Sequence, residues 1–219
     1  MGRYLTLLAI VAIAATGGTA LGQGADVALV NLVSGDVTYV PQEGTPGRVQ
    51  PFMKVRHGDR LNVAAGGQVR ILFFEGARQE LWTGPASFRA AKTEAEPISG
   101  NAAQIANLPS PVPQRMARVP ELIQNAKLGG ARVRGVPPRQ QKPGLDQEAT
   151  LARARAAYEK MRQDMPADDI TPELYLYAEL YEFLAYDDMK AVVAEMRRKQ
   201  PDNQDAKALD AWLASRMSR

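Results

Sequence analysis

The hydrophobic pattern of this chain changes its period near the middle, and this change limits the possible folds more than any other feature. Between about residues 27 and 90, apolar residues occur in short runs interrupted by Gly, Pro, Asp and Asn, which is typical of strands. From Asp146 onward they recur every three or four positions among Ala, Glu and Arg, which is typical of amphipathic helices. The sequence therefore predicts an α+β fold, with a small all-β sandwich or barrel domain followed by a four-helix antiparallel helical-hairpin domain.

Six segments in the first half are expected to form strands: 27–33, 36–40, 60–64, 68–74, 77–83 and 86–90. The clearest pair lies in "QVRILFFEGARQELW", where Gly76 is expected to take a positive φ and close a tight hairpin. Leu72 and Phe74 make the first strand of this pair apolar on both faces towards its end. We therefore expect that strand to be central in the sandwich or barrel.

Three further regions complete the predicted domain organisation. The β domain is expected over 23–91, a basic connector rich in Pro and Gly over 92–145, and the helical domain over 146–219. The connector is expected to hold one short helix, over 121–128. The expected N-terminal caps of the later helices are Asp146, Thr171, which precedes Pro172, and Asn203.

Residues 1–22 are predicted to be a secretory signal peptide. Arg3 gives a basic start, 5–15 is an uncharged apolar run, and small residues precede an expected cleavage after Gly22. The run is shorter than the roughly 20 residues of a spanning helix, so we expect no membrane span after cleavage. Retention of the segment as an anchor is the alternative. The expected location is the periplasm or the exterior, and the chain has no cysteine for disulfides.

The formal net charge of +3 is unevenly distributed along the chain. Residues 112–145 carry seven basic and one acidic residue, a net +6, whereas 146–219 carry eleven basic and fifteen acidic residues, a net −4. Arg132, Arg134 and Arg139 are the basic candidates for partner binding. The segment is expected to be a solvated linker, to dock onto the acidic helical domain, or to bind an anionic envelope surface. It has no aromatic residue for base stacking, so nucleic acid is not an expected partner.

The stretch "KVRHGDRL" contains the only histidine of the chain, His57. One histidine and no cysteine exclude a multi-histidine or thiolate metal site, and no metal or cofactor is expected. Catalysis by His57 and Asp59 would also need a nucleophile and an oxyanion donor, and no serine lies in a nucleophile-elbow motif. We instead expect a structural turn in which Gly58 supplies an unusual φ and Asp59 accepts backbone N–H groups. A pH-sensing role of His57 is the alternative.

Four tyrosines, at positions 175, 177, 181 and 186, cluster in the second predicted helix and the turn after it. Such a cluster either fills a core or offers a surface that stacks on sugar or holds a peptide. Tyr177 and Tyr181 lie on the stripe expected to be buried. Tyr175 lies off that stripe and is therefore the predicted surface residue for partner binding.

Two resemblances accompany these patterns. The motifs "SGDV", "HGDRLNVAAGGQVRILFFEGARQELW" and "ASFRA" resemble the periplasmic FecR-type domain over about residues 27–90. This resemblance implies a folded, exported β module and brings no catalytic residues. Residues 173–201 are similar to one tetratricopeptide unit, which implies a helical module for protein–protein interaction. The matching positions are Glu173, Leu176, Tyr177, Leu180, Met189, Val193 and Pro201.

The sequence thus predicts an exported, non-catalytic protein-interaction or scaffolding protein of the bacterial cell envelope, with an envelope protein as partner. The alternative is a periplasmic ligand- or glycan-binding module that acts through its β domain. Neither the partner's identity nor the oligomeric state follows from the sequence.

Overall fold

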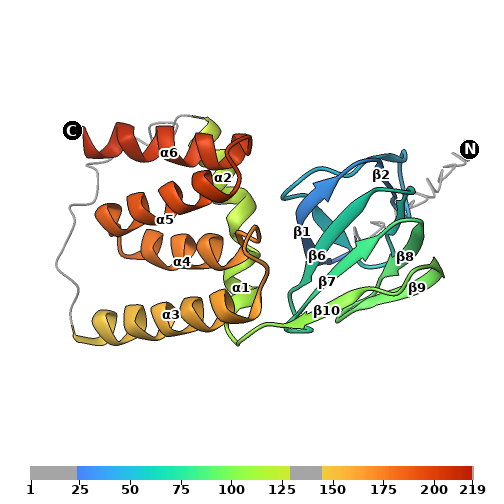
Figure 1. The fold of residues 1–219 in the computed structure, drawn as a ribbon, viewed down its shortest axis with the longest axis horizontal. Helices are drawn as coiled ribbons and strands as arrows, with labels where there is room; N and C mark the ends of the chain where they lie inside the picture. The colour runs from blue at the N-terminus through green and yellow to red at the C-terminus, as the bar shows by residue number, and fades with distance from the viewer. Residues whose placement is uncertain (1–23, 129–144, 219) are drawn as a thin grey trace, which may run out of the picture.

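A computed structural model gives the structure of residues 24–128 and 145–218 (Figure 1). Within these residues, two antiparallel five-stranded sheets precede the helices, which confirms the α+β class. Sheet A has the order β10 (Gln104–Asn107), β7 (Arg78–Thr83), β6 (Gln68–Phe73), β1 (Asp26–Ser34) and β4 (Lys54–Arg56). Sheet B has the order β3 (Gly47–Arg48), β2 (Val37–Val40), β5 (Arg60–Val63), β8 (Ala86–Ala90) and β9 (Ala95–Gly100).

The inner faces of the two sheets enclose an aliphatic core. Val69, Ile71 and Phe73 of β6 point into it because alternate residues of a strand share a face. Trp82 of β7 stacks on Phe88 of β8 with their ring centroids 4.4 Å apart, so this aromatic pair joins sheet A to sheet B. The predicted sandwich is therefore the architecture of the β domain.

All six predicted strands are present, but the predicted end of the β domain at residue 91 is wrong. β9 pairs with β8 and β10 pairs with β7, so the sheets continue to Asn107. Both are edge strands with mainly exposed side chains, and β9 contains Pro97. An exposed edge strand lacks the alternation of buried and exposed residues that identifies a strand in a sequence. The short strands β3 and β4 were missed as well.

The β6–β7 hairpin is confirmed, but Gly76 does not have the predicted role. The positive φ of this turn belongs to Ala77, at 48°. At Gly76 an added Cβ would lie 1.8 Å from the carbonyl oxygen of Thr93. Glycine is therefore required here because another backbone segment approaches closely.

Among the described residues, the chain continues with the helices α1 (Val112–Met116), α2 (Val119–Lys127), α3 (Leu145–Asp164), α4 (Thr171–Glu182), α5 (Tyr186–Lys199) and α6 (Gln204–Met217). α3 to α6 are the four predicted helices, and α2 matches the predicted short helix. Of the predicted caps, Asn203 is confirmed, because its side chain accepts hydrogen bonds from the N–H groups of Asp205 and Ala206. Asp146 and Thr171 instead lie inside the first turns of α3 and α4.

The predicted connector over 92–145 is wrong for the part that the structure describes. This part holds β9, β10, α1 and α2, and the two helices pack against α4 and α6. Val112, Met116, Val119 and Ile123 of α1 and α2 are buried in the same core as the later helices. Of the prolines that indicated a linker, Pro111 is the N-cap residue of α1 and Pro113 lies in its first turn.

The outer face of sheet A packs against the helices and forms a second core with them. Leu29 of β1 and Leu72 of β6 belong to this core, and so does Phe52, which precedes β4. The fold is therefore three layers, with sheet A between sheet B and the helices (Figure 1). This explains why the β6 strand is apolar on both faces. No described helix combines the length and hydrophobicity needed to cross a bilayer.

Candidate functional site

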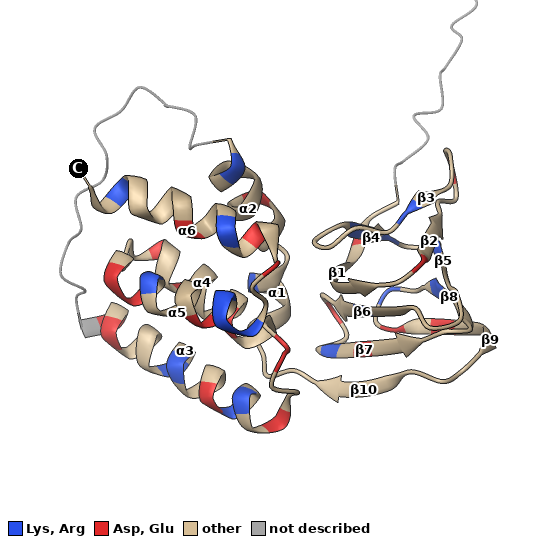
Figure 2. Cartoon of the chain, turned by 45° about the horizontal axis from the view of Figure 1, so that its top comes forward, with Lys and Arg blue, Asp and Glu red and all other residues tan. Residues whose placement is uncertain are grey.

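Four helix ends face sheet A at the contact between the β domain and the helices, a region that we call the junction (Figure 1). The C-terminal ends of α3 and α5 alternate there with the N-terminal ends of α4 and α6. Figure 2 shows basic and acidic residues near one another at these ends. Because helix N-termini carry partial positive charge and C-termini partial negative charge, the alternation favours polar groups of both signs.

Five buried polar residues connect sheet A to the start of α4, and we call them the junction network. The Asn31 Nδ2 group donates to Gln79 Oε1 at 2.8 Å and to Thr171 Oγ1 at 2.7 Å. Gln79 Nε2 donates to Asp169 Oδ2 at 2.8 Å, and Arg70 Nη1 lies 3.4 Å from the same oxygen. The N–H and hydroxyl groups of Thr171 donate to Asp169 Oδ1 at 2.8 and 2.6 Å.

The junction network favours one orientation of the helices on sheet A. None of its members is more than 5 % exposed. A buried polar group that loses its partner costs about 1–3 kcal/mol, so these contacts penalise any other docking geometry. Asp169 accepts from both layers, which makes it the central residue of the network. The Oδ1 atom of Asn31 is buried and has no hydrogen-bond partner among the described residues.

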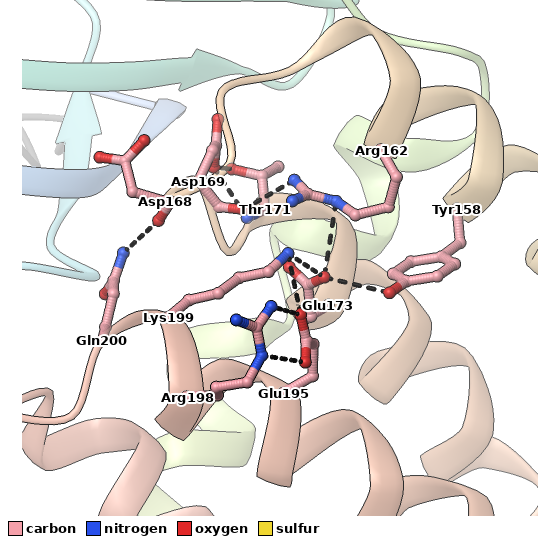
Figure 3. Close-up of polar contacts among 10 residues, drawn as sticks. All are labelled: Tyr158, Arg162, Asp168, Asp169, Thr171, Glu173, Glu195, Arg198, Lys199 and Gln200. Atoms are coloured by element: carbon pink, nitrogen blue, oxygen red, sulfur yellow. Dashed lines mark hydrogen bonds and ion pairs between the residues drawn. The ribbon is translucent and has the colours of Figure 1, made fainter.

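A second buried cluster lies directly behind the network and surrounds Glu173 of α4 (Figure 3). Glu173 Oε1 accepts a hydrogen bond from the Tyr158 hydroxyl at 3.1 Å and lies 2.7 Å from Lys199 Nζ and 3.5 Å from Arg162 Nε. Burial, followed by the charge and hydrogen bond of Glu173, raises the pKa of Tyr158 to about 12. The phenol therefore stays protonated near neutral pH and donates. Arg162 Nη2 also donates to the Asp169 carbonyl at 2.7 Å, which links the two clusters.

A cavity of about 550 Å³, which we call the junction cavity, lies beside the network. Its wall includes Asn31 of β1, Gln50, Lys127 at the end of α2, and Gln200 and Asp202 between α5 and α6. Gln200 holds this wall in place, because its Nε2 group donates to the Asp168 carbonyl at 2.9 Å and its Oε1 accepts from Asn203 at 2.8 Å. The volume is in the range of about 300–1,000 Å³ that is typical of ligand sites.

An aromatic cluster lies at the opposite end of the helices, where α5 begins and α6 ends. Trp212 is its centre, with ring centroids 5.6 Å from Tyr181 and 6.2 Å from Tyr186, and with the Arg216 guanidinium carbon 5.3 Å above its ring. Tyr186, Arg216 and the exposed Met217 line a hollow of about 310 Å³. Burial raises the pKa of Tyr186, so its hydroxyl remains a hydrogen-bond donor near neutral pH.

Of the predicted partner-binding residues, Tyr175 lies in the core, and its expected position on the surface is wrong. It is 2 % exposed, and burial raises its pKa to about 12. The stripe argument fails because α4 is the central helix: every residue from Thr171 to Leu180 is buried. The prediction that core filling accounts for Tyr177 is confirmed.

Arg132, Arg134 and Arg139 lie outside the described residues, as does the predicted signal peptide. The described basic residues of the same segment do contact the acidic helical domain. Arg115 pairs with Glu179 at 2.8 Å, Arg118 with Glu182 at 2.7 Å, and Lys127 with Asp205 at 2.5 Å. The segment was expected to be a solvated linker, to dock onto the helical domain or to bind an anionic surface. Its described part docks onto the helices.

The predicted turn at Gly58 and Asp59 is confirmed. Gly58 has a φ of 87°, and the buried Asp59 carboxylate accepts a hydrogen bond from the Arg56 N–H group at 3.0 Å. The His57 side chain is exposed. This turn lies in the β domain and contributes no residue to the junction network or to the junction cavity.

The junction residues were not predicted as a site, although one signal was available. Arg70, Leu72 and Phe74 alternate along one strand, so a polar residue shares the outer face of β6 with apolar ones. An outer face of this mixed kind indicates that another layer covers it. No pattern in the sequence indicated that this layer was α4.

No group of three or more His, Asp or Glu side chains in the described ranges is placed to hold a metal ion. The chain was also compared with models of protein families, with curated proteins and with solved structures, and none of the three comparisons finds a match.

Proposed function

We propose that this is an exported, non-catalytic protein-interaction protein of the bacterial cell envelope, which binds its partner through the aromatic cluster. The basic start of the chain and the apolar run of 5–15 support export. The helical-hairpin arrangement of α3 to α6 supports a role in protein interaction. The resemblances to the FecR-type domain and to a tetratricopeptide unit favour the same role.

The composition and position of the aromatic cluster carry this proposal. Residues that dominate binding energy at protein interfaces are mainly Trp, Tyr and Arg, and Met is also enriched there. Tyr186, Arg216 and Met217 line one hollow together with Asp187, and the buried Trp212 packs against Tyr186 and Arg216. Its lining residues belong to the start of α5 and the end of α6, and these helix ends face away from the β domain (Figure 1), so a partner can reach them without contact with either sheet.

The rigid junction supports a scaffolding role in addition. The β domain and the helices share a core and a buried polar network, so a partner on the helices is held at a fixed position relative to the sandwich. A flexible tether between two domains would not fix that position.

Photo-cross-linking in intact cells tests the proposed surface. A photoreactive amino acid replaces Tyr186 in one variant and the exposed Ala156 of α3 in a control variant. We expect a discrete adduct with one envelope protein at position 186 and none at 156. The adduct should disappear when Arg216→Glu is added, because the changed charge lies in the same hollow. Equal adducts at both positions, or no protein adduct at 186, would reject the aromatic cluster as the partner surface.

A further inference from the structure

The junction cavity has a wall with both apolar and polar parts. Leu32 and Val33 of β1 form apolar parts, together with Pro51 and Pro201 from the two facing loops. The polar parts come from carboxamide and carboxylate side chains and from the ammonium group of Lys127. A wall of this kind fits a small ligand that has an aliphatic body and a few polar groups.

Two features of the wall would normally attract an anion, but both are already satisfied within the protein. The N-terminus of α6 is capped, because Asn203 Oδ1 accepts from the Asp205 and Ala206 N–H groups at 2.9 and 3.0 Å. The Lys127 ammonium is 2.5 Å from the Asp205 carboxylate. Neither group is therefore available for a phosphate or a carboxylate without loss of an existing contact.

The polar groups that remain are mainly acceptors. Asp202 forms no ion pair with another described residue and lies in the exposed part of the wall. The Gln50 carboxamide makes no hydrogen bond within the described ranges and offers one acceptor oxygen and one donor group. Asn31 contributes no free donor to the cavity, because its Nδ2 group is fully used by the junction network and its Oδ1 atom is buried. A carboxylate without an ion-pair partner, such as that of Asp202, selects for a cationic hydrogen-bond donor.

We propose that the junction cavity binds a ligand with a protonated amine on an aliphatic body. The ammonium group pairs with Asp202 and donates to neighbouring acceptors of the wall, and the methylene groups pack against Leu32, Val33 and the two prolines. This chemistry occurs in free aliphatic amines and in the side chain of a peptide lysine. The site is separate from the aromatic cluster and does not depend on the proposed function.

Calorimetric titration of the purified protein tests this site with four probes that share a short aliphatic chain. Two are amines, 1,5-diaminopentane and N-acetyl-lysine methylamide, and two are controls, pentan-1-ol and hexanoate. We expect binding of an amine and no binding of the alcohol or the acid. Binding of the diamine alone assigns a free amine, and binding of the lysine derivative alone assigns a peptide side chain. Binding of both supports the shared chemistry.

Two substitutions separate this site from non-specific attraction to exposed carboxylates of the protein. Asp202→Asn should weaken amine binding by about tenfold, because a charged hydrogen bond becomes a neutral one. Asp146→Asn removes an exposed carboxylate from the first turn of α3 and should leave the affinity unchanged. Failure of both amines to bind, equal binding of pentan-1-ol, or the same loss in both variants would overturn the proposal. None of these outcomes bears on the cross-linking result at Tyr186.

Discussion

Sheet A and sheet B have five strands each, but only sheet A is covered on both faces. In sheet B, the outer side chains of Asn62 and Ser87 face each other across β5 and β8, and the Ser87 hydroxyl donates to Asn62 at 2.9 Å near the surface. In sheet A, the outer side chains of Arg70 and Gln79 are buried against the helices. Polar residues on the outer face of a strand thus contribute little to stability when that face is at the surface. When another layer covers the face, they fix the orientation of that layer.

The helices cover sheet A and not sheet B, so their stability depends on contacts with sheet A. Leu29 and Leu72 of sheet A lie in the core of the helical layer, so these helices do not bury their apolar surface alone. α4 in particular is buried on all sides and has no solvent-facing stripe over its first ten residues, Thr171 to Leu180. We therefore regard the helices as a layer built on sheet A, and the predictions below test this dependence.

The largest effect is expected for Asp169→Ala. This change removes the acceptor of Gln79, Thr171 and Arg70 together and leaves the Arg70 guanidinium, 5 % exposed, without its counter-charge. Breaking a buried pair in this way costs about 3–5 kcal/mol. Urea unfolding, followed by tryptophan fluorescence, should show this loss of stability. The neighbouring Asp168→Ala changes an exposed side chain and keeps the backbone carbonyl that accepts from Gln200, so its midpoint should stay close to wild type. Equal shifts for the two variants would contradict the central role of Asp169.

The second prediction compares apolar residues of the two sheets. Leu72→Ala removes a fully buried side chain from the contact between sheet A and the helices, and should cost about 2–5 kcal/mol. Hydrogen exchange should show faster exchange in the first turns of α4, while the pairing of β5 with β8 stays protected. Ile98→Ala in β9 of sheet B changes a side chain that is 47 % exposed, and should cost no more than about 0.5 kcal/mol. If α4 keeps its protection in Leu72→Ala, the helices do not depend on sheet A.

Sequence reasoning identified the layers but could not place them on one another. The periods of the apolar residues predicted the six main strands and the four later helices, because side chains on one face recur about every two residues in a strand and about every 3.6 residues in a helix. The same reasoning placed Tyr175 on the surface, because a stripe argument assumes that a helix has an exposed face. No pattern in the sequence distinguished Asp169 as the central residue of the junction network. Its carboxylate does accept the Thr171 N–H group, but its contacts with Arg70 and Gln79 depend on residues far away in the chain.

A smaller effect is expected at the start of α6, where the junction holds a cavity instead of a packed contact. Asn203→Ala removes the side-chain oxygen that caps two N–H groups, and should cost about 1 kcal/mol. Asn203→Asp keeps an accepting oxygen at this position and should restore most of the loss. Thermal unfolding of the three proteins side by side measures the difference. A loss in Asn203→Ala as large as that in Asp169→Ala would mean that the cavity wall and the junction network stabilise the protein equally.

The smallest effect concerns the pH dependence of Glu179, which lies on α4 away from sheet A and pairs with Arg115 of α1. Burial raises the pKa of this carboxyl above its ordinary value of 4.5, although the charge and hydrogen bond of Arg115 act in the opposite direction. A carboxyl whose pKa is higher in the folded than in the unfolded protein contributes most stability below its unfolded pKa, and this contribution is lost as the pH rises through the folded pKa.

The free energy of unfolding of wild type minus that of Glu179→Gln should therefore fall as the pH increases from about 4 towards neutrality. Urea unfolding of both proteins at a series of pH values measures this difference. Glu148→Gln changes an exposed carboxyl in the first turn of α3 and serves as the matched control. A difference that increases with pH would show that the ion pair with Arg115 outweighs the burial of Glu179. The ion pair of Arg115 with Glu179 would then be the dominant interaction in the contact between α1 and α4.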